Sequence, residues 1–217
     1  QSVIGVEAIA QMEMADDYPD IVIGCAGGGS NFAGLAFPFL GAQLRGGKKV
    51  RIIASDPAAC PSLTRGTYAY DFGDTGNLTP LVKMYTLGSS FMPPGFHAGG
   101  LRYHGMSGIV SHVKNLGLIE AEAYQQIGCF DAAVKFARSE GIVPAPESSH
   151  AIRAVFEQAE QCKQEGTAKT ILFNLSGHGH FDMAAYTDYF AGNLEDRDYD
   201  EAALQTALAA LPQVAAE

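Results

Sequence analysis

Positive charge is scarce in this chain and is concentrated nowhere. The 217 residues include 14 lysines and arginines against 24 acidic residues, a formal net charge of −10, and no basic run exceeds Lys48-Lys49. Binding to nucleic acid or to anionic lipid requires clustered basic side chains. We therefore expect neither nucleic acid nor a membrane as a partner.

Disulfide patterns and long apolar runs are missing as well. The four cysteines (Cys25, Cys60, Cys129 and Cys162) are widely spaced and form no CxxC pair, which is typical of reduced thiols that fill a core. No apolar run approaches the roughly 20 residues of a transmembrane helix. These absences favour a cytoplasmic protein. With 47% hydrophobic and only 18% charged residues, the chain is suited to a folded core rather than to disorder.

A glycine-rich turn is the most informative motif. Residues 24–31 read Gly-Cys-Ala-Gly-Gly-Gly-Ser-Asn and directly follow the apolar run at 21–23, which predicts a strand, a tight turn and a helix over 32–44. Such a turn directs free backbone N–H groups and the positive end of the helix dipole at one point, an arrangement that suits phosphate best. Glycine permits the close approach, and Ser30 adds a hydroxyl donor. An ordinary strand–helix turn is the alternative, since the glycines fit neither GxGxxG nor the P-loop.

Strand and helix patterns alternate along the chain. Apolar patterns predict strands over 21–25, 50–55 and 170–175, and helices over 2–16, 32–44, 120–140, 149–165 and 182–191. We therefore expect an α/β fold of three layers, in which a mainly parallel twisted sheet of about four strands carries helices on both faces. Residues 57–108, rich in Gly, Pro and Tyr, are expected to form long functional loops.

A second glycine turn is predicted at the same edge of the sheet. Ser176-Gly177-His178-Gly179 follows the strand over 170–175, and ligands of open parallel sheets bind at the carboxyl ends of the strands. The two turns therefore converge on one cleft. His178, His180 and Asp182 are also candidate metal ligands, but the flanking glycines would give such a site little rigid support, and we expect no metal.

Glu147 is a third candidate, in the stretch 140–151 that reads EGIVPAPESSHA. It precedes a helix whose N-cap is expected to be Ser148 or Ser149. Position alone favours a carboxylate that stabilises the helix N-terminus. A role in the cleft is the alternative.

Together these stretches resemble the tryptophan synthase β chain family, which are fold-type II pyridoxal phosphate (PLP) enzymes. The motifs GGGSN at 27–31, EGIVPAPESSHA at 140–151 and LSGHGHFD at 175–182 follow one another in the family's order, and SVIGVE at 2–7 resembles the stretch before the family's phosphate loop. Residues 97–105 are more similar to the second, tryptophan synthase-like branch of the family. The resemblance extends to about residue 190.

The resemblance implies a role for each motif. Ser176 would face the pyridine nitrogen of PLP, where a neutral hydroxyl leaves that nitrogen unprotonated and favours β-elimination and replacement. Glu147 would be the catalytic residue near the cofactor face opposite the leaving group. The phosphate of PLP would be bound by five consecutive residues: Gly27, Gly28, Gly29, Ser30 and Asn31.

The implied reaction is that of a carbon–oxygen lyase in tryptophan biosynthesis. Indole replaces the hydroxyl of L-serine, which gives L-tryptophan and water, and the chemistry is carried by PLP while the protein orients it. The resemblance further implies a homodimer. An α subunit is expected as a partner for the standard branch of the family, and less so for the branch that this sequence resembles.

Arg102 departs from the family pattern, because the standard β chain has an aspartate there. Together with Gly99 and Gly100, it is a candidate for substrate binding. A cation at this position would suit an anionic leaving group, so O-phosphoserine is an alternative donor. A solvated loop arginine is the other interpretation. His178 also departs from the pattern, since an arginine is usual there.

The main feature of the family that this chain lacks is the lysine that forms the Schiff base with PLP. In this family it lies upstream of the phosphate loop, and no lysine here precedes that loop. Gln1 is not a natural initiator residue. We therefore expect the C-terminal portion of a longer enzyme, inactive alone, with a PLP phosphate-binding domain over 1–192 and an acidic, helical tail over 193–217.

Two other functions stay open. Another type II PLP lyase, similar to threonine synthase or serine dehydratase, would share the glycine loop, although the combination of PAPESSHA with SGHGHFD argues against it. A non-catalytic phosphate-ligand-binding module is the alternative from a different class, and the absent lysine is its main support.

Overall fold

A four-stranded parallel sheet forms the centre of the molecule. The computed structural model describes residues 1–214, and its strands lie in the order β5-β2-β1-β6. All three pairings are parallel, and the central strand β1 is paired on both sides. The strands are β1 (Ile21–Cys25), β2 (Arg51–Pro57), β5 (Glu120–Tyr124) and β6 (Ile171–Phe173). The predicted fold class, α/β with a mainly parallel sheet, is confirmed.

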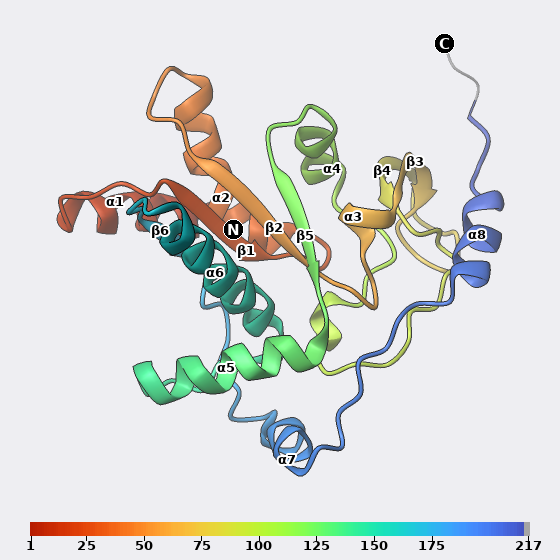
Figure 1. The fold of residues 1–217 in the computed structure, drawn as a ribbon. Helices are drawn as coiled ribbons and strands as arrows, with labels where there is room; N and C mark the ends of the chain where they lie inside the picture. The colour runs from red at the N-terminus through yellow and green to blue at the C-terminus, as the bar shows by residue number, and fades with distance from the viewer. Residues whose placement is uncertain (215–217) are drawn as a thin grey trace.

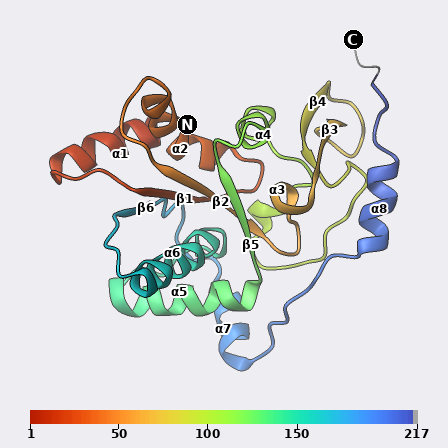
Figure 2. The same ribbon diagram turned by 45° about the horizontal axis from the view of Figure 1, so that its top comes forward.

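Helices cover both faces of this sheet, as Figure 2 shows. On one face lie α1 (Val3–Met14), α2 (Ser30–Leu44) and α4 (Gly108–Asn115), and on the other α5 (Gln126–Glu140) and α6 (Pro146–Glu165). Each face of the sheet packs its own hydrophobic core. Along a strand the side chains alternate between the two cores, because successive side chains point to opposite faces. Val22 packs in the core beneath α2, whereas Ile21 and Ile23 pack in the core beneath α6.

The predicted helix over 120–140 is wrong for its first five residues, 120–124. They form β5, which pairs with β2 from Ile53 to Pro57, and only residues 126–140 are helical. Glutamate and alanine favour helix locally, but the pairing with β2 decides the conformation. The guanidinium of Arg51 in β2 donates to the carboxylate of Glu120 in β5 at 2.7 Å, which joins the two strands through their side chains.

The segment 57–108 is more regular than the sequence indicates. It contains a short helix α3 (Ser62–Arg65), an antiparallel hairpin of β3 (Thr67–Phe72) and β4 (Leu81–Thr86), and the 3₁₀ turn η1 (Gly99–Leu101). The connection within the hairpin is organised by Asp74, whose carboxylate accepts from the backbone N–H groups of Leu78 and Thr79. The hairpin stands beside the sheet at the right of Figure 1. The residues between these elements form loops, as predicted.

The C-terminal region adds two helices. α7 (Met183–Ala191) packs against α5, with Tyr186 against Phe130. α8 (Glu201–Ala209) lies at the right of Figure 1. The carboxylate of its N-cap, Asp200, accepts from the first turn, and the helix buries Leu204 and Ala207 against Leu87. The predicted division at residue 192 stays a prediction, and residues 215–217 of the predicted tail lie outside the described residues. No helix within residues 1–214 is both long and apolar enough to cross a membrane.

A substitution at Gly5 tests the packing of α1 on α2. A Cβ atom at Gly5 would lie 2.4 Å from the backbone oxygen of Leu35 and 2.7 Å from Pro38, so Gly5→Ala forces the helices apart. We expect a loss of about 1–3 kcal/mol in the free energy of unfolding, measured by urea denaturation. Gly95→Ala is the matched control, because no atom lies within 4 Å of its Cβ position. Equal stability of the two variants would contradict the packing described.

Candidate active site

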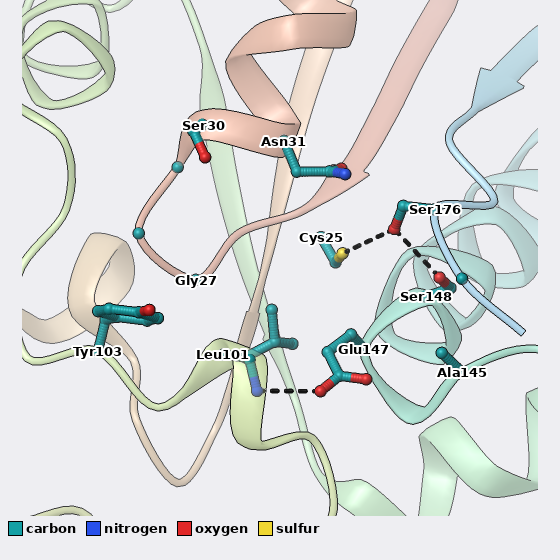
Figure 3. Close-up of a pocket in the computed structure, with 14 residues that line it drawn as sticks. Cys25, Gly27, Ser30, Asn31, Leu101, Tyr103, Ala145, Glu147, Ser148 and Ser176 are labelled. Carbon is teal, nitrogen blue, oxygen red and sulfur yellow. Dashed lines mark hydrogen bonds between the residues drawn. The ribbon is translucent and has the colours of Figure 1, made fainter. Parts of the chain in front are cut away.

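Most of the predicted site residues meet in one cavity of about 570 Å³. It lies at the carboxyl ends of β1 and β6, where the two glycine turns follow their strands, so the predicted convergence is confirmed. The loop after β1 forms one wall and the loop after β6 the opposite wall (Figure 3). The start of α6 and the η1 turn contribute further lining residues, namely Ala145, Glu147, Ser148, Gly100 and Leu101.

Residues 27–31 present a set of free donors to this cavity. Within the described chain, none of their five backbone N–H groups donates a hydrogen bond to another protein group. Gly29 is the N-cap of α2 and has φ +97°, a left-handed conformation that favours glycine. The 15-residue helix α2 begins at Ser30, so the positive end of its dipole lies at the same point. The electrostatics of this wall would therefore favour an anion.

Close packing beneath the loop explains two of its three glycines. A Cβ atom at Gly27 would lie 2.3 Å from the backbone oxygen of Gly100, and one at Gly29 would lie 2.6 Å from the sulfur of Met106. At Gly28 the nearest atoms are those of the Tyr103 ring, at 4.0 Å. The loop is thus pressed against the protein at Gly27 and Gly29, while Gly28 borders open space.

Ser176 lies on the opposite wall with its side chain exposed to the cavity. Its hydroxyl is 3.2 Å from the hydroxyl of Ser148 and 3.9 Å from the sulfur of Cys25 (Figure 3). Burial raises the pKa of the Cys25 thiol to about 11, so the thiol stays protonated at neutral pH and is not a nucleophile. Ser176, Ser148 and Cys25 therefore form a small cluster of neutral groups joined by hydrogen bonds.

Glu147 lies in the first turn of α6, and its carboxylate accepts a hydrogen bond of 2.9 Å from the backbone N–H of Gly100. The prediction that Ser148 or Ser149 is the N-cap of this helix is wrong. The helix begins earlier, with Ala145 as N-cap and Pro146 as its first residue. Proline suits that position because its ring fixes φ and the missing N–H would lack a helical partner anyway.

The other predicted substrate residues lie differently. Gly100 lines the cavity, whereas Gly99 and Arg102 are not among its lining residues in the described chain. Arg102 is exposed, and its guanidinium donates to the backbone oxygen of Pro93 at 2.7 Å. Its role toward a substrate stays a prediction.

The candidate metal ligands do not form a metal site in the part of the chain that the structure describes. His178 and His180 lie ring to ring at 4.6 Å, yet no group of three His, Cys, Asp or Glu side chains converges within residues 1–214. Gly177 and Gly179 instead form backbone hydrogen bonds with the segment before α6. The backbone N–H of Gly179 donates to Val143 and that of Ala145 donates to Gly177, which joins the loop after β6 to the start of α6.

Six lining residues of the cavity were not among the predicted site residues, namely Cys25, Leu101, Tyr103, Ala145, Ser148 and Gly177. Cys25 is the last residue of the predicted strand and could have been found from its position beside the glycine loop. Tyr103, with 52% of its surface exposed, lines the cavity from the stretch 97–105, whose resemblance to the second branch of the family was the one signal that could have pointed to it. Ser148 was considered only as a helix cap. No lysine or arginine among residues 1–214 lines the cavity, so its donors there are uncharged.

The chain is similar to known families of enzymes. A family model described as "Pyridoxal-phosphate dependent enzyme" matches residues 1–177. Among curated proteins, the chain is 60% identical over 195 residues to tryptophan synthase beta chain 2 of Methanosarcina mazei and 59% identical over 199 residues to that of Aquifex aeolicus. These matches cover 90% of this chain but only 44% and 46% of the two relatives. The chain therefore spans less than half the length of the curated relatives it matches.

Solved structures agree on the fold. A fungal L-serine ammonia-lyase from Rhizomucor miehei superimposes with a TM-score of 0.62 over 89% of this chain and 55% of that one. A threonine deaminase from T.th. does so with a TM-score of 0.58 over 81% of this chain and 56% of that one. Each is only 18% identical to this chain in sequence, so the two similarities show a shared fold and nothing about function.

A pair of glycine substitutions tests the geometry of the loop. Gly27→Ala places a methyl group against the backbone oxygen of Gly100, which has no freedom to move aside. We expect this variant to lose about 1–3 kcal/mol of unfolding free energy, measured by urea denaturation. Gly28→Ala is the control and should stay within about 0.5 kcal/mol of the wild type. A stable Gly27→Ala variant would show that the loop does not pack as described.

His150, in α6 next to the cavity segment, predicts a pH dependence. Its ring is 1% exposed, Nδ1 is 3.0 Å from the backbone oxygen of Pro146, and Nε2 has no partner within the described residues. Burial lowers the pKa of His150 to about 4 from its usual 6.5. The unfolded chain therefore binds a proton between these pH values while the folded chain does not.

Stability should accordingly fall as the pH drops from about 6.5 to about 4. The slope contributed by one such histidine is at most about 1.4 kcal/mol per pH unit. His150→Asn keeps a donor toward Pro146 but does not titrate, so its unfolding free energy should decline less steeply over this range. Parallel pH profiles of the two proteins, measured by urea denaturation, would count against a neutral buried His150.

Proposed function

The chain belongs to the pyridoxal-phosphate-dependent enzymes, and from this premise we propose that it is the phosphate-binding part of a tryptophan synthase β-like enzyme. That enzyme would replace the hydroxyl of L-serine, or the phosphate of O-phosphoserine, with indole to give L-tryptophan. The identity of 50–60% to tryptophan synthase β chains supports the reaction class. Because the chain spans less than half of those relatives, the activity of the whole enzyme is part of the proposal.

The observation that carries the proposal is the set of N–H groups at residues 27–31 that have no acceptor within the described chain, beside a cavity with Ser176 on its far wall. PLP has a phosphate at one end of a pyridine ring and a basic nitrogen in that ring. The donor set fits it, because backbone N–H groups at a helix N-terminus suit the phosphate and a hydroxyl suits the ring nitrogen. The open space beside Gly28 leaves room for such a group.

When bound, PLP would supply the stabilisation of negative charge on the substrate carbon. This chain's residues would do the rest of the binding. Residues 27–31 would hold the phosphate, and Ser176 would donate to the ring nitrogen without protonating it. Glu147 is restrained by its bond to Gly100, so its carboxylate would be held at a fixed place on the cavity wall.

The lysine that holds the aldehyde of PLP would come from outside this chain. None of the seven lysines lines the cavity of the described residues. The chain alone should therefore bind the cofactor and form no tryptophan. Assembly into a homodimer, and association with an α subunit, also belong to the proposal and rest on the relatives.

Binding assays on the 217-residue chain test the site. Pyridoxal phosphate should bind at least tenfold more tightly than pyridoxal, which lacks the phosphate, because each hydrogen bond to a charged group contributes about 1.5–3 kcal/mol. Ser176→Ala should lower the affinity for pyridoxal phosphate by roughly 3–10-fold. Ser139→Ala is the control, since its exposed hydroxyl bonds only within α5. Isothermal titration calorimetry measures all four affinities, and equal binding of the two ligands would overturn the phosphate site.

The reaction itself is tested on the proposed full-length enzyme, of which this chain would be one part. Formation of tryptophan from L-serine and indole, followed by chromatography, is the expected result. Release of pyruvate and ammonia with no tryptophan would instead identify a serine dehydratase-like lyase. A parallel assay with O-phosphoserine distinguishes the two donors.

A further inference from the structure

Ser148 belongs to the lining of the cavity, but it is fully buried and its hydroxyl bonds to that of Ser176. It is in the first turn of α6 and is 0% exposed, whereas its neighbour across the bond, Ser176, is exposed. The two hydroxyl oxygens are 3.2 Å apart, and Figure 3 shows both side chains turned toward each other on the wall opposite the glycine loop. The function described above assigns no role to Ser148.

The direction of this hydrogen bond follows from burial. Within residues 1–214 the Ser148 hydroxyl has no partner other than Ser176. The adjacent Ser149 differs, because its hydroxyl donates to the backbone oxygen of Ala145 at 2.9 Å. A hydroxyl carries a single hydrogen. If Ser176 donated to Ser148, the buried hydrogen of Ser148 would have no acceptor, which is strongly disfavoured. Ser148 must therefore donate, and Ser176 must accept.

Cys25 is the only other group bonded to the Ser176 hydroxyl in the described residues, with its sulfur at 3.9 Å. It competes poorly for the hydrogen of Ser176, because a thiol sulfur is a weak acceptor. With Ser148 donating to its oxygen, Ser176 keeps its own hydrogen free for a group in the cavity.

We propose that Ser148 is a positioning residue that fixes the Ser176 hydroxyl as a hydrogen-bond donor toward the cavity. The assignment rests on the proposed function, in which the ring nitrogen of PLP faces Ser176. A ring nitrogen that meets an O–H donor is bound in its unprotonated form. Without Ser148, the Ser176 hydroxyl is free to rotate and to accept a hydrogen bond from a protonated ring nitrogen.

The test uses 4-deoxypyridoxine 5′-phosphate, a probe that has the phosphate and the ring nitrogen but no aldehyde, so its binding requires no lysine. The protonation of its ¹⁵N-labelled ring nitrogen is followed by NMR across a pH titration of the bound probe. We expect Ser148→Ala to raise the pKa of the bound ring nitrogen by about one unit, a roughly tenfold change in its protonation equilibrium. Ser149→Ala, one residue along the same helix and equally buried, should leave that pKa unchanged.

The outcomes separate the two proposals. A wild-type chain that does not bind the probe overturns the phosphate site and this assignment with it. A wild-type chain that binds the probe, with the same ring-nitrogen pKa in Ser148→Ala, overturns the role of Ser148 alone. Circular dichroism establishes whether Ser148→Ala folds. If it does not, Ser148→Cys has nearly the same volume and a weaker donor, and an unchanged pKa in that variant also overturns the assignment.

Discussion

The parallel pairing of β1 with both β2 and β6 is the constraint on which the site depends. Three strands that run in one direction end at one edge of the sheet, and the chain must turn there each time. The turn after β1 becomes the glycine loop and the turn after β6 brings Ser176, although most of the chain separates them in sequence. One set of backbone hydrogen bonds thus fixes the distance between the two walls of the cavity.

A second interaction completes the site. The backbone pairing of residues 143–145 with 177–179 holds the start of α6 against the loop after β6. This pairing brings Glu147 and Ser148 to the cavity, where one bonds to Gly100 and the other to Ser176. The first turn of α6 is therefore placed by its neighbours as well as by the proline that begins it.

Local pattern was sufficient for the features that depend on neighbouring residues. The glycine turns, the strand over 21–25, the presence of a strand within 170–175 (of which only Ile171–Phe173 is extended) and most helix positions could be predicted because each is encoded within a short window. Residues 120–124 could not, because strand formation there requires pairing with β2, which lies far away in the chain. The position of Tyr103 at the cavity and the direction of the Ser148 hydrogen bond could not be predicted either, since both depend on tertiary contacts.

The glycine loop holds its donors as dipoles rather than as full charges, and it does so in a molecule with a net charge of −10. A phosphate approaching such a protein is repelled at long range and attracted only at contact. Dissolved salt screens the long-range repulsion but hardly weakens short hydrogen bonds within a cavity. Rising ionic strength should thus leave phosphate binding intact or favour it, the reverse of its effect at lysine- and arginine-rich sites.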